Sequence, residues 1–193
     1  MGFAMGVLFA NISSSPFIVQ QHYGFSAFEF SLFFGINALA IGLAAGLSVK
    51  FKNPEHAMFL GSVGMTIMSA VEFVILSNEY HFAVYEAVLF VLLFSMGLTF
   101  TASTTLAMDC ERANSGTASA LFGAAGFAFG GIVSPLVGLG DILSTTGLIF
   151  FVCSVCSLCF SVFAMNQTHT NLWGSFKCKM GPVARFVFLR REK

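Results

Sequence analysis

Six long stretches without Asp, Glu, Lys or Arg divide this chain of 193 residues. They cover residues 1–28, 30–49, 56–71, 87–108, 113–140 and 142–176. A helix that crosses a hydrocarbon core of about 30 Å needs about 20 apolar residues, so stretches of this length predict membrane-spanning helices. Charged residues make up 9% of the chain, against roughly 25% in a soluble domain. This composition excludes a soluble enzyme, a nucleic-acid-binding protein and a disordered protein.

The charged residues between these stretches set the bounds of six predicted helices. We expect an all-α integral membrane protein whose spans cover about residues 2–19, 28–49, 57–76, 83–108, 115–139 and 142–165. A transmembrane β-barrel would instead show short strands of alternating polarity. Residues 166–193 form a predicted basic tail outside the membrane.

The positive charges predict the orientation of the chain. Every Lys and Arg falls in the second connection, the fourth connection or the tail, whereas the other connections carry Glu29, Glu79 and Asp141. Cytoplasmic segments carry the excess of Lys and Arg, so we expect both termini to be cytoplasmic. The first span begins at residue 2 without a polar or basic flank, and we therefore expect the chain to start partway through a longer protein.

Two amide side chains lie at mid-depth in predicted spans, where polar residues are rare and often functional. Asn11 belongs to the first span and Asn37 to the second. Each amide needs hydrogen-bond partners in hydrocarbon, so both should face the bundle or a wet cavity. Two interpretations stay open: the amides line a substrate cavity, or they bond to neighbouring helices, for example to each other.

Glu72 and Glu86 are acidic residues within predicted spans, and they are candidates for proton coupling. Each lies seven residues from Glu79, at the centre of the third connection. This spacing puts both about 10 Å below the outer connection on adjacent antiparallel helices. Two carboxyl groups at one depth could share a proton. The alternative is a structural role, or contact with water at the outer interface.

Glycine and proline indicate how the helices pack. Pro135 removes a backbone hydrogen bond within the fifth span and is expected to kink that helix. Glycines four residues apart let helices approach closely, which predicts ordinary packing or, alternatively, a dedicated dimer face. These pairs are Gly2/Gly6, Gly42/Gly46 and Gly126/Gly130.

The remaining reactive residues indicate no catalytic chemistry. Cys153, Cys156 and Cys159 resemble part of an iron–sulfur motif, but they lie mid-span and lack a fourth ligand at suitable spacing. We interpret them as small apolar residues. We expect no enzyme activity, no cofactor, no metal site and no nucleic-acid partner.

Two groups of short motifs occur in a fixed order. The first comprises Ser13–Phe17, Tyr23–Ser26 and Phe33–Leu39; the second comprises Ala113–Leu121, Gly130 and Ser134–Gly138. Together they resemble the second half of a major facilitator superfamily drug exporter of the bicyclomycin/chloramphenicol-resistance (Bcr/CflA) type. The resemblance covers most of residues 1–165 and implies one carboxy-terminal half of a twelve-helix fold.

This resemblance implies a function. Such transporters rock two six-helix halves around a central site, and the implied activity is export of drugs or other small molecules in exchange for protons across a bacterial inner membrane. Spans one, two, four and five would line the cavity, which favours Asn11 and Asn37 as substrate contacts. The implied partners are a small-molecule substrate, protons, the lipid bilayer, and the missing amino-terminal half or a second half-transporter.

Two alternatives stay open from the sequence. The same fold could carry an endogenous metabolite rather than a drug. The chain could also be a non-transporting membrane protein that binds a partner, or an inactive remnant of a transporter.

Overall fold

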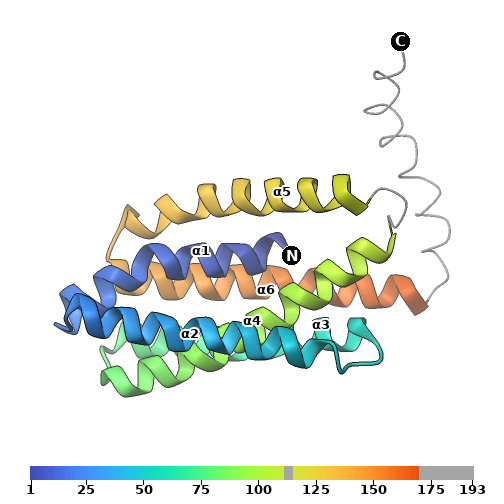
Figure 1. The fold of residues 1–193 in the computed structure, drawn as a ribbon. Helices are drawn as coiled ribbons and strands as arrows, with labels where there is room; N and C mark the ends of the chain where they lie inside the picture. The colour runs from blue at the N-terminus through green and yellow to red at the C-terminus, as the bar shows by residue number, and fades with distance from the viewer. Residues whose placement is uncertain (111–114, 170–193) are drawn as a thin grey trace, which may run out of the picture.

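A computed structural model describes residues 1–110 and 115–169 of the chain, and within this part every regular element is a helix. Figure 1 shows an elongated bundle of these helices. Six of the described helical segments are long and apolar enough to cross a membrane, as the sequence predicts. In order, the elements are α1 (Gly2–Pro16), the π-helix η1 (Phe17–His22), α2 (Ala27–Ser48), α3 (Pro54–Ser77), α4 (Phe82–Cys110), α5 (Ser115–Leu136), the 3₁₀-helix η3 (Val137–Leu139) and α6 (Ile142–His169).

Two helices run past the ends expected from hydropathy. The first predicted span continues through the π-helix to His22, although Gln20 and Gln21 are polar. Helix α6 continues to His169, four residues beyond the predicted end of the sixth span. A helix can extend beyond its apolar residues, because its backbone hydrogen bonds also form outside the membrane. The predicted tail beyond residue 169 lies outside the described residues.

Local side-chain bonds define how α2 and α6 begin. The Ser26 hydroxyl accepts from the Glu29 backbone N–H, while the Glu29 carboxylate accepts from the Ser26 backbone N–H, which is a capping box. The Asp141 carboxylate accepts from the backbone N–H of Ser144 at 3.0 Å and from its hydroxyl at 2.8 Å. These bonds satisfy backbone donors that a helix leaves free in its first turn. Both capped ends lie at the end of the bundle predicted to be outside.

Close approaches at glycine determine how several helices pack. A Cβ placed on Gly61 of α3 would lie 2.8 Å from the backbone oxygen of Ser95 in α4. A Cβ on Gly147 of α6 would lie 2.9 Å from the Cα of Phe73 in α3, and one on Gly97 of α4 would lie 3.1 Å from the Cα of Ile41 in α2. Helix α3 is therefore held tightly between α4 and α6, and α2 is held against α4.

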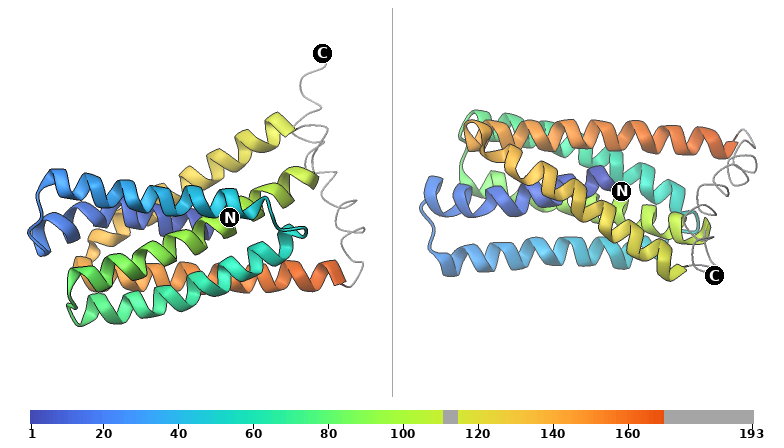
Figure 2. Two further views of the ribbon diagram at one scale, coloured as in Figure 1. Left: turned by 60° about the horizontal axis from the view of Figure 1, so that its bottom comes forward. Right: turned by 90° about the horizontal axis from the view of Figure 1, so that it is seen from above.

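Helix α1 lies between α5 and α6 on the other side of the bundle. Gly6 approaches the Phe129 ring of α5 and the Cys153 sulfur of α6. The hydroxyls of Ser13 and Ser134 form a hydrogen bond between α1 and α5. Figure 2 shows that α5, drawn in yellow, diverges from α6 toward its own N-terminal end.

Helices α2 and α5 are the least covered long helices of the described bundle. In their most apolar segments 17% and 22% of the residues are buried, whereas half are buried in α1 and in α4. Large side chains such as Phe28, Leu39 and Leu43 on α2 and Leu121 on α5 stand more than 60% exposed. Each of these two helices therefore presents a broad apolar face to its surroundings.

The predicted glycine pairs divide between these two environments. Gly6, Gly126 and Gly130 lie in contacts between helices, as ordinary packing requires. Gly42 and Gly46 lie on the open face of α2, where an added Cβ would meet nothing within 4 Å in the described part of the chain.

Pro135 lies in the last turn of α5, one residue before that helix ends. The backbone then tightens into the 3₁₀-helix η3 over Val137–Leu139. The fifth predicted span is thus an α-helix followed by a short 3₁₀ segment, with proline just before the change. The kink predicted at Pro135 would therefore lie where the α-helix changes to the 3₁₀-helix.

Candidate functional site

The sequence candidates Asn37 and Glu86 meet in the structure. Asn37 on α2 is 5% exposed, and its Nδ2 donates a hydrogen bond of 2.9 Å to Oε1 of Glu86 on α4. Helices α2 and α4 both begin at the predicted outer end and run in the same direction. Their packing places Asn37 of α2 in contact with Glu86 of α4. A substrate-cavity candidate and a proton-coupling candidate therefore form one polar pair, although the sequence analysis assigned them separate roles.

Asn11 has a different partner. Its Oδ1 accepts a hydrogen bond of 2.8 Å from the Ser15 hydroxyl, one turn further along α1. The two amides do not bond to each other in the described structure. Ser15 itself is 4% exposed and lies beside Asn37 and Glu86, where the three line a small cavity. The polar side chains of α1 thus reach the Asn37–Glu86 pair through Ser15.

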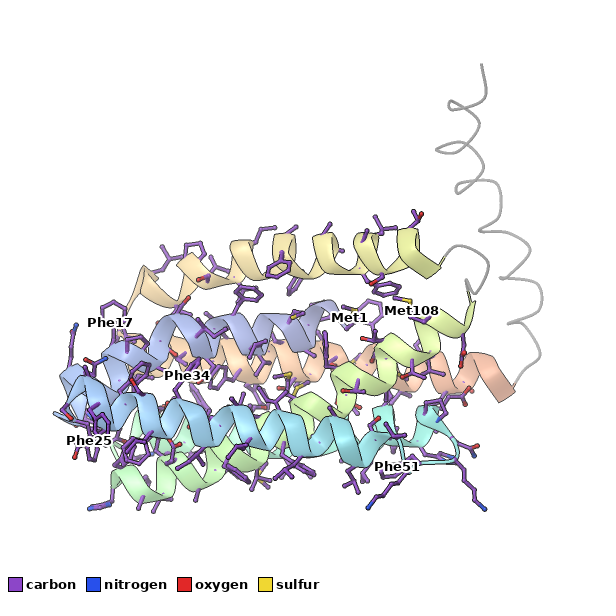
Figure 3. The ribbon with its side chains drawn as sticks, in the orientation of Figure 1. Met1, Phe17, Phe25, Phe34, Phe51 and Met108 are labelled. Carbon is purple, nitrogen blue, oxygen red and sulfur yellow. The ribbon has the colours of Figure 1, made fainter. Side chains whose placement is uncertain are left out.

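That small cavity lies among α1, α2 and α4. Its volume is about 10 Å³, and Val19, Phe30, Phe33, Phe34 and Leu89 complete its walls. A space of this size holds about one water molecule when polar groups line it. The Asn37–Glu86 pair is therefore placed where one small polar molecule or ion could contact it. Figure 3 shows Phe34 in this part of the bundle, next to α1 and α2.

Glu72 is the most deeply buried carboxyl group of the described residues. It is 0% exposed on α3, and within the described structure neither of its oxygens has a hydrogen-bond partner. The Gly61–Ser95 and Gly64–Ser95 contacts set the antiparallel register of α3 and α4, and this register brings Glu72 level with Glu86. The two carboxyl groups lie within electrostatic range of each other. A buried carboxyl group without partners is energetically unfavourable, which is typical of residues kept for function.

Tyr85 is a residue of this site that the sequence analysis missed. Its side chain is 1% exposed, and its hydroxyl is buried. It lies within electrostatic range of both Glu72 and Glu86 and close to Ser15. A tyrosine directly before an acidic residue in a membrane span is the signal that could have identified it.

An aromatic cluster covers this site at the predicted outer end. The Phe82 ring lies 4.4–5.2 Å, between centroids, from the rings of Tyr23, Phe25 and Phe33, and the rings of Phe25 and Phe33 lie 5.3 Å apart. The Tyr23 hydroxyl donates a hydrogen bond of 2.9 Å to the backbone oxygen of Tyr80. Burial raises the pKa of Tyr23, with the charges of Glu72 and Glu79 adding to the rise. Figure 3 shows Phe17 and Phe25 at this end, with Phe51 and Met108 at the opposite end.

These features describe an apolar bundle with a buried polar site beneath the aromatic cluster at its predicted outer end. The chain is similar to an MFS-type transporter. It is 35% identical over 159 residues to an uncharacterized MFS-type transporter, YdgK, of Bacillus subtilis (strain 168). The match covers 80% of this chain and 40% of the relative, so the chain spans less than half the length of that protein. No family model and no solved structure matches the chain.

The membrane-spanning helices and this homologue identify the chain as an integral membrane protein. MFS denotes the major facilitator superfamily, the family that the sequence motifs resemble.

Proposed function

We propose that this chain is the carboxy-terminal half of a major facilitator transporter of the Bcr/CflA type, which exports drugs or other small molecules in exchange for protons. The hydrogen bond between Asn37 and Glu86 carries this proposal, because it places a carboxyl group and an amide beside a small cavity inside an apolar bundle. Polar side chains at such depth are rare and mark substrate or ion pathways. The similarity to an MFS-type transporter supports the same assignment.

The positions of the side chains indicate a separate role for each residue of the site. Asn37 can present its amide to a substrate while its Nδ2 orients the Glu86 carboxyl group. Glu86 lines the cavity, whereas Glu72 is fully buried behind it, with Tyr85 close to both. We propose that a proton bound within this group biases the transporter between its two orientations. Asn11 supports the group through Ser15.

The exposed faces of α2 and α5 support a second half. Both helices carry large apolar side chains without partners in the described bundle, and in a full transporter these faces would pack against the missing amino-terminal half or a second half-transporter. Because Gly42 and Gly46 on α2 carry no side chain, they would let the second half approach closely. Rocking of one bundle against the other would then expose the cavity to each side of the membrane in turn. We place the protein in a bacterial inner membrane with both termini in the cytoplasm.

A drug-accumulation assay tests the proposal. Cells that lack their own exporters would express this chain alone, or joined to an upstream six-helix half. We expect only the longer protein to lower accumulation, and we expect a protonophore to abolish the effect. Export that survives the protonophore would contradict proton coupling, and no change with any drug would favour transport of a metabolite or an inactive remnant.

Variants of the longer protein test the individual residues. Glu86→Gln and Glu72→Gln should each reduce export driven by a pH gradient, whereas Glu55→Gln at the opposite end of α3 serves as the matched control. Asn37→Ala should change drug selectivity or affinity while expression stays near normal. Normal transport in the Glu72→Gln/Glu86→Gln double variant would refute the proton role, and loss of expression in Asn37→Ala would indicate a packing role.

A further inference from the structure

The two buried carboxyl groups differ in their access to the small cavity. Glu86 lines that cavity together with Ser15 and Asn37, whereas Glu72 is 0% exposed and is not part of its walls. Both Glu72 oxygens and Oε2 of Glu86 are buried and have no hydrogen-bond partner in the described structure. A proton that reaches the cavity can therefore bind Glu86 directly, but it needs a further polar group to reach Glu72.

The packing of α3 against α4 places Tyr85 at the depth of both carboxyl groups. A Cβ on Gly64 of α3 would lie 2.8 Å from the Ser95 hydroxyl oxygen of α4, and this contact sets the antiparallel register. Toward the predicted outer end, Glu72 lies eight residues beyond Gly64, or about 12 Å, and Tyr85 lies ten residues from Ser95, or about 15 Å. Tyr85 is 1% exposed while its neighbour Val84 is 46% exposed, so the Tyr85 ring points into the bundle.

We propose that the Tyr85 hydroxyl passes a proton between Glu86 and Glu72. A tyrosine hydroxyl both donates and accepts a hydrogen bond, as a relay between two carboxyl groups requires. Oε2 of protonated Glu86 gives its proton to the Tyr85 oxygen, while the Tyr85 O–H gives its own proton to a Glu72 carboxylate oxygen. Two O–H bonds break and two form, so Tyr85 is neutral before and after. The negative charge moves from Glu72 to Glu86, and no group is oxidised or reduced.

The other polar groups near Tyr85 do not replace it. Tyr23 faces it from the end of η1, with ring centroids 5.8 Å apart, but the Tyr23 hydroxyl donates to the backbone oxygen of Tyr80. The Ser15 hydroxyl lies close to Tyr85 and donates to Oδ1 of Asn11. The lysines of the described residues lie beyond the opposite end of α2 and hold neither carboxyl group ionised. Two carboxyl groups within electrostatic range of each other then favour sharing one proton.

The relay gives each carboxyl group a distinct part in the proposed function, and the inference rests on that function only for its effect on transport. With the proton on Glu72, Glu86 faces the cavity as a carboxylate, and its bond from Asn37 is strengthened by the charge. With the proton on Glu86, the charge lies on Glu72, away from the cavity. Tyr85 thus connects a buried place for the proton to an accessible one.

Infrared spectroscopy of the purified 193-residue chain in lipid nanodiscs tests the inference, at a pH low enough to protonate both carboxyl groups. The C=O stretch of a protonated carboxyl group shifts when deuterium replaces its proton, and Glu72→Gln and Glu86→Gln identify the two bands by removing them. After transfer to heavy water, we expect Tyr85→Phe to slow exchange at Glu72 about tenfold or more, because phenylalanine carries no exchangeable proton. Exchange at Glu86 should keep its rate, because this group reaches the cavity itself.

A matched variant separates a relay from a disturbed structure. Tyr80→Phe removes the hydroxyl of a side chain that is 51% exposed, and both bands should exchange as in the unaltered chain. Exchange at Glu72 that is as fast in Tyr85→Phe as in the unaltered chain, or faster, would overturn the inference, as would the absence of a protonated Glu72 band. Slowed exchange at Glu72 with unchanged proton-driven export in the longer Tyr85→Phe protein would support the relay and refute the proposed proton role of Glu72 alone.

Discussion

The packing of α3 against α4 at Gly61 gives a prediction with a magnitude. In Gly61→Ala the new Cβ would lie 2.5 Å from the Thr99 hydroxyl oxygen and 2.8 Å from both the Ser95 backbone oxygen and the Thr99 backbone nitrogen. Ordinary van der Waals contact begins at 3.4 Å, so α3 and α4 must separate locally by at least 0.6 Å. Two of the three atoms belong to the backbone of α4, and a rotamer change cannot move them away.

The expected cost follows from comparison with a matched glycine. Overpacking a helix interface costs about 1–3 kcal/mol, while alanine favours a helix over glycine by about 1 kcal/mol. Gly42→Ala on α2 gains the same propensity, and its Cβ meets nothing within 4 Å among the described residues. Gly61→Ala should therefore be less stable than Gly42→Ala by about 1–3 kcal/mol.

Unfolding of the purified chain by sodium dodecyl sulfate in mixed micelles, followed by circular dichroism, measures this difference. The helical signal is large because all regular elements of the described residues are helices. If Gly61→Ala and Gly42→Ala unfold at the same detergent fraction, then α3 and α4 do not pack as closely at Gly61 as described.

Three further predictions concern the polar groups. Glu72→Met should raise the free energy of unfolding by about 1–3 kcal/mol because it removes a buried carboxyl group without hydrogen-bond partners in the described structure; a less stable variant in the same detergent titration would contradict this. A double-mutant cycle with Asn37→Ala and Glu86→Ala should give a coupling energy of about 1.5–3 kcal/mol, as for a hydrogen bond to a charged group, and no coupling would mean the bond is not formed. The hydrogen bonds from Ser144 hold the pKa of Asp141 below its ordinary value of 3.8. The bonds therefore stabilise the first turn of α6 above that pH, and this stabilisation is lost as the pH falls through the lower pKa of the folded state. Circular dichroism should therefore record a loss of stability between pH 5 and 2. This loss should be smaller in Asp141→Asn.

The number and order of the helices could be predicted because charge is excluded from hydrocarbon and marks each connection. The exact ends could not. Helix η1 contains Gln20 and Gln21, and hydropathy alone gives no reason for a helix to continue there. The capping box of Ser26 and Glu29 has the serine-to-glutamate spacing that signals a helix start, but Glu29 was interpreted only as a charge in a connection.

The candidate site was predicted in its members but not in its pairings. Asn37 and Glu86 each stand out as polar residues in apolar spans, yet their bond depends on the parallel register of α2 and α4, which are not consecutive in the chain. The antiparallel register of α3 and α4 brings Tyr85 close to Glu72, and the packing of α1 brings Ser15 beside the pair. Such contacts between distant segments follow from packing, and a single sequence carries no direct record of them.

The π-helix at the outer end of α1 sets the direction in which Tyr23 points. The backbone N–H of Tyr23 bonds to the oxygen of Ile18, five residues earlier, so each such turn holds one residue more than an α-helical turn. If the same residues formed α-helical turns instead, Tyr23 would turn by about 100° around the helix axis. Its hydroxyl would then leave Tyr80, and the aromatic cluster would lose one ring. The π-helical bonding of this segment thus holds the cover over the polar site in place without involving any residue of that site.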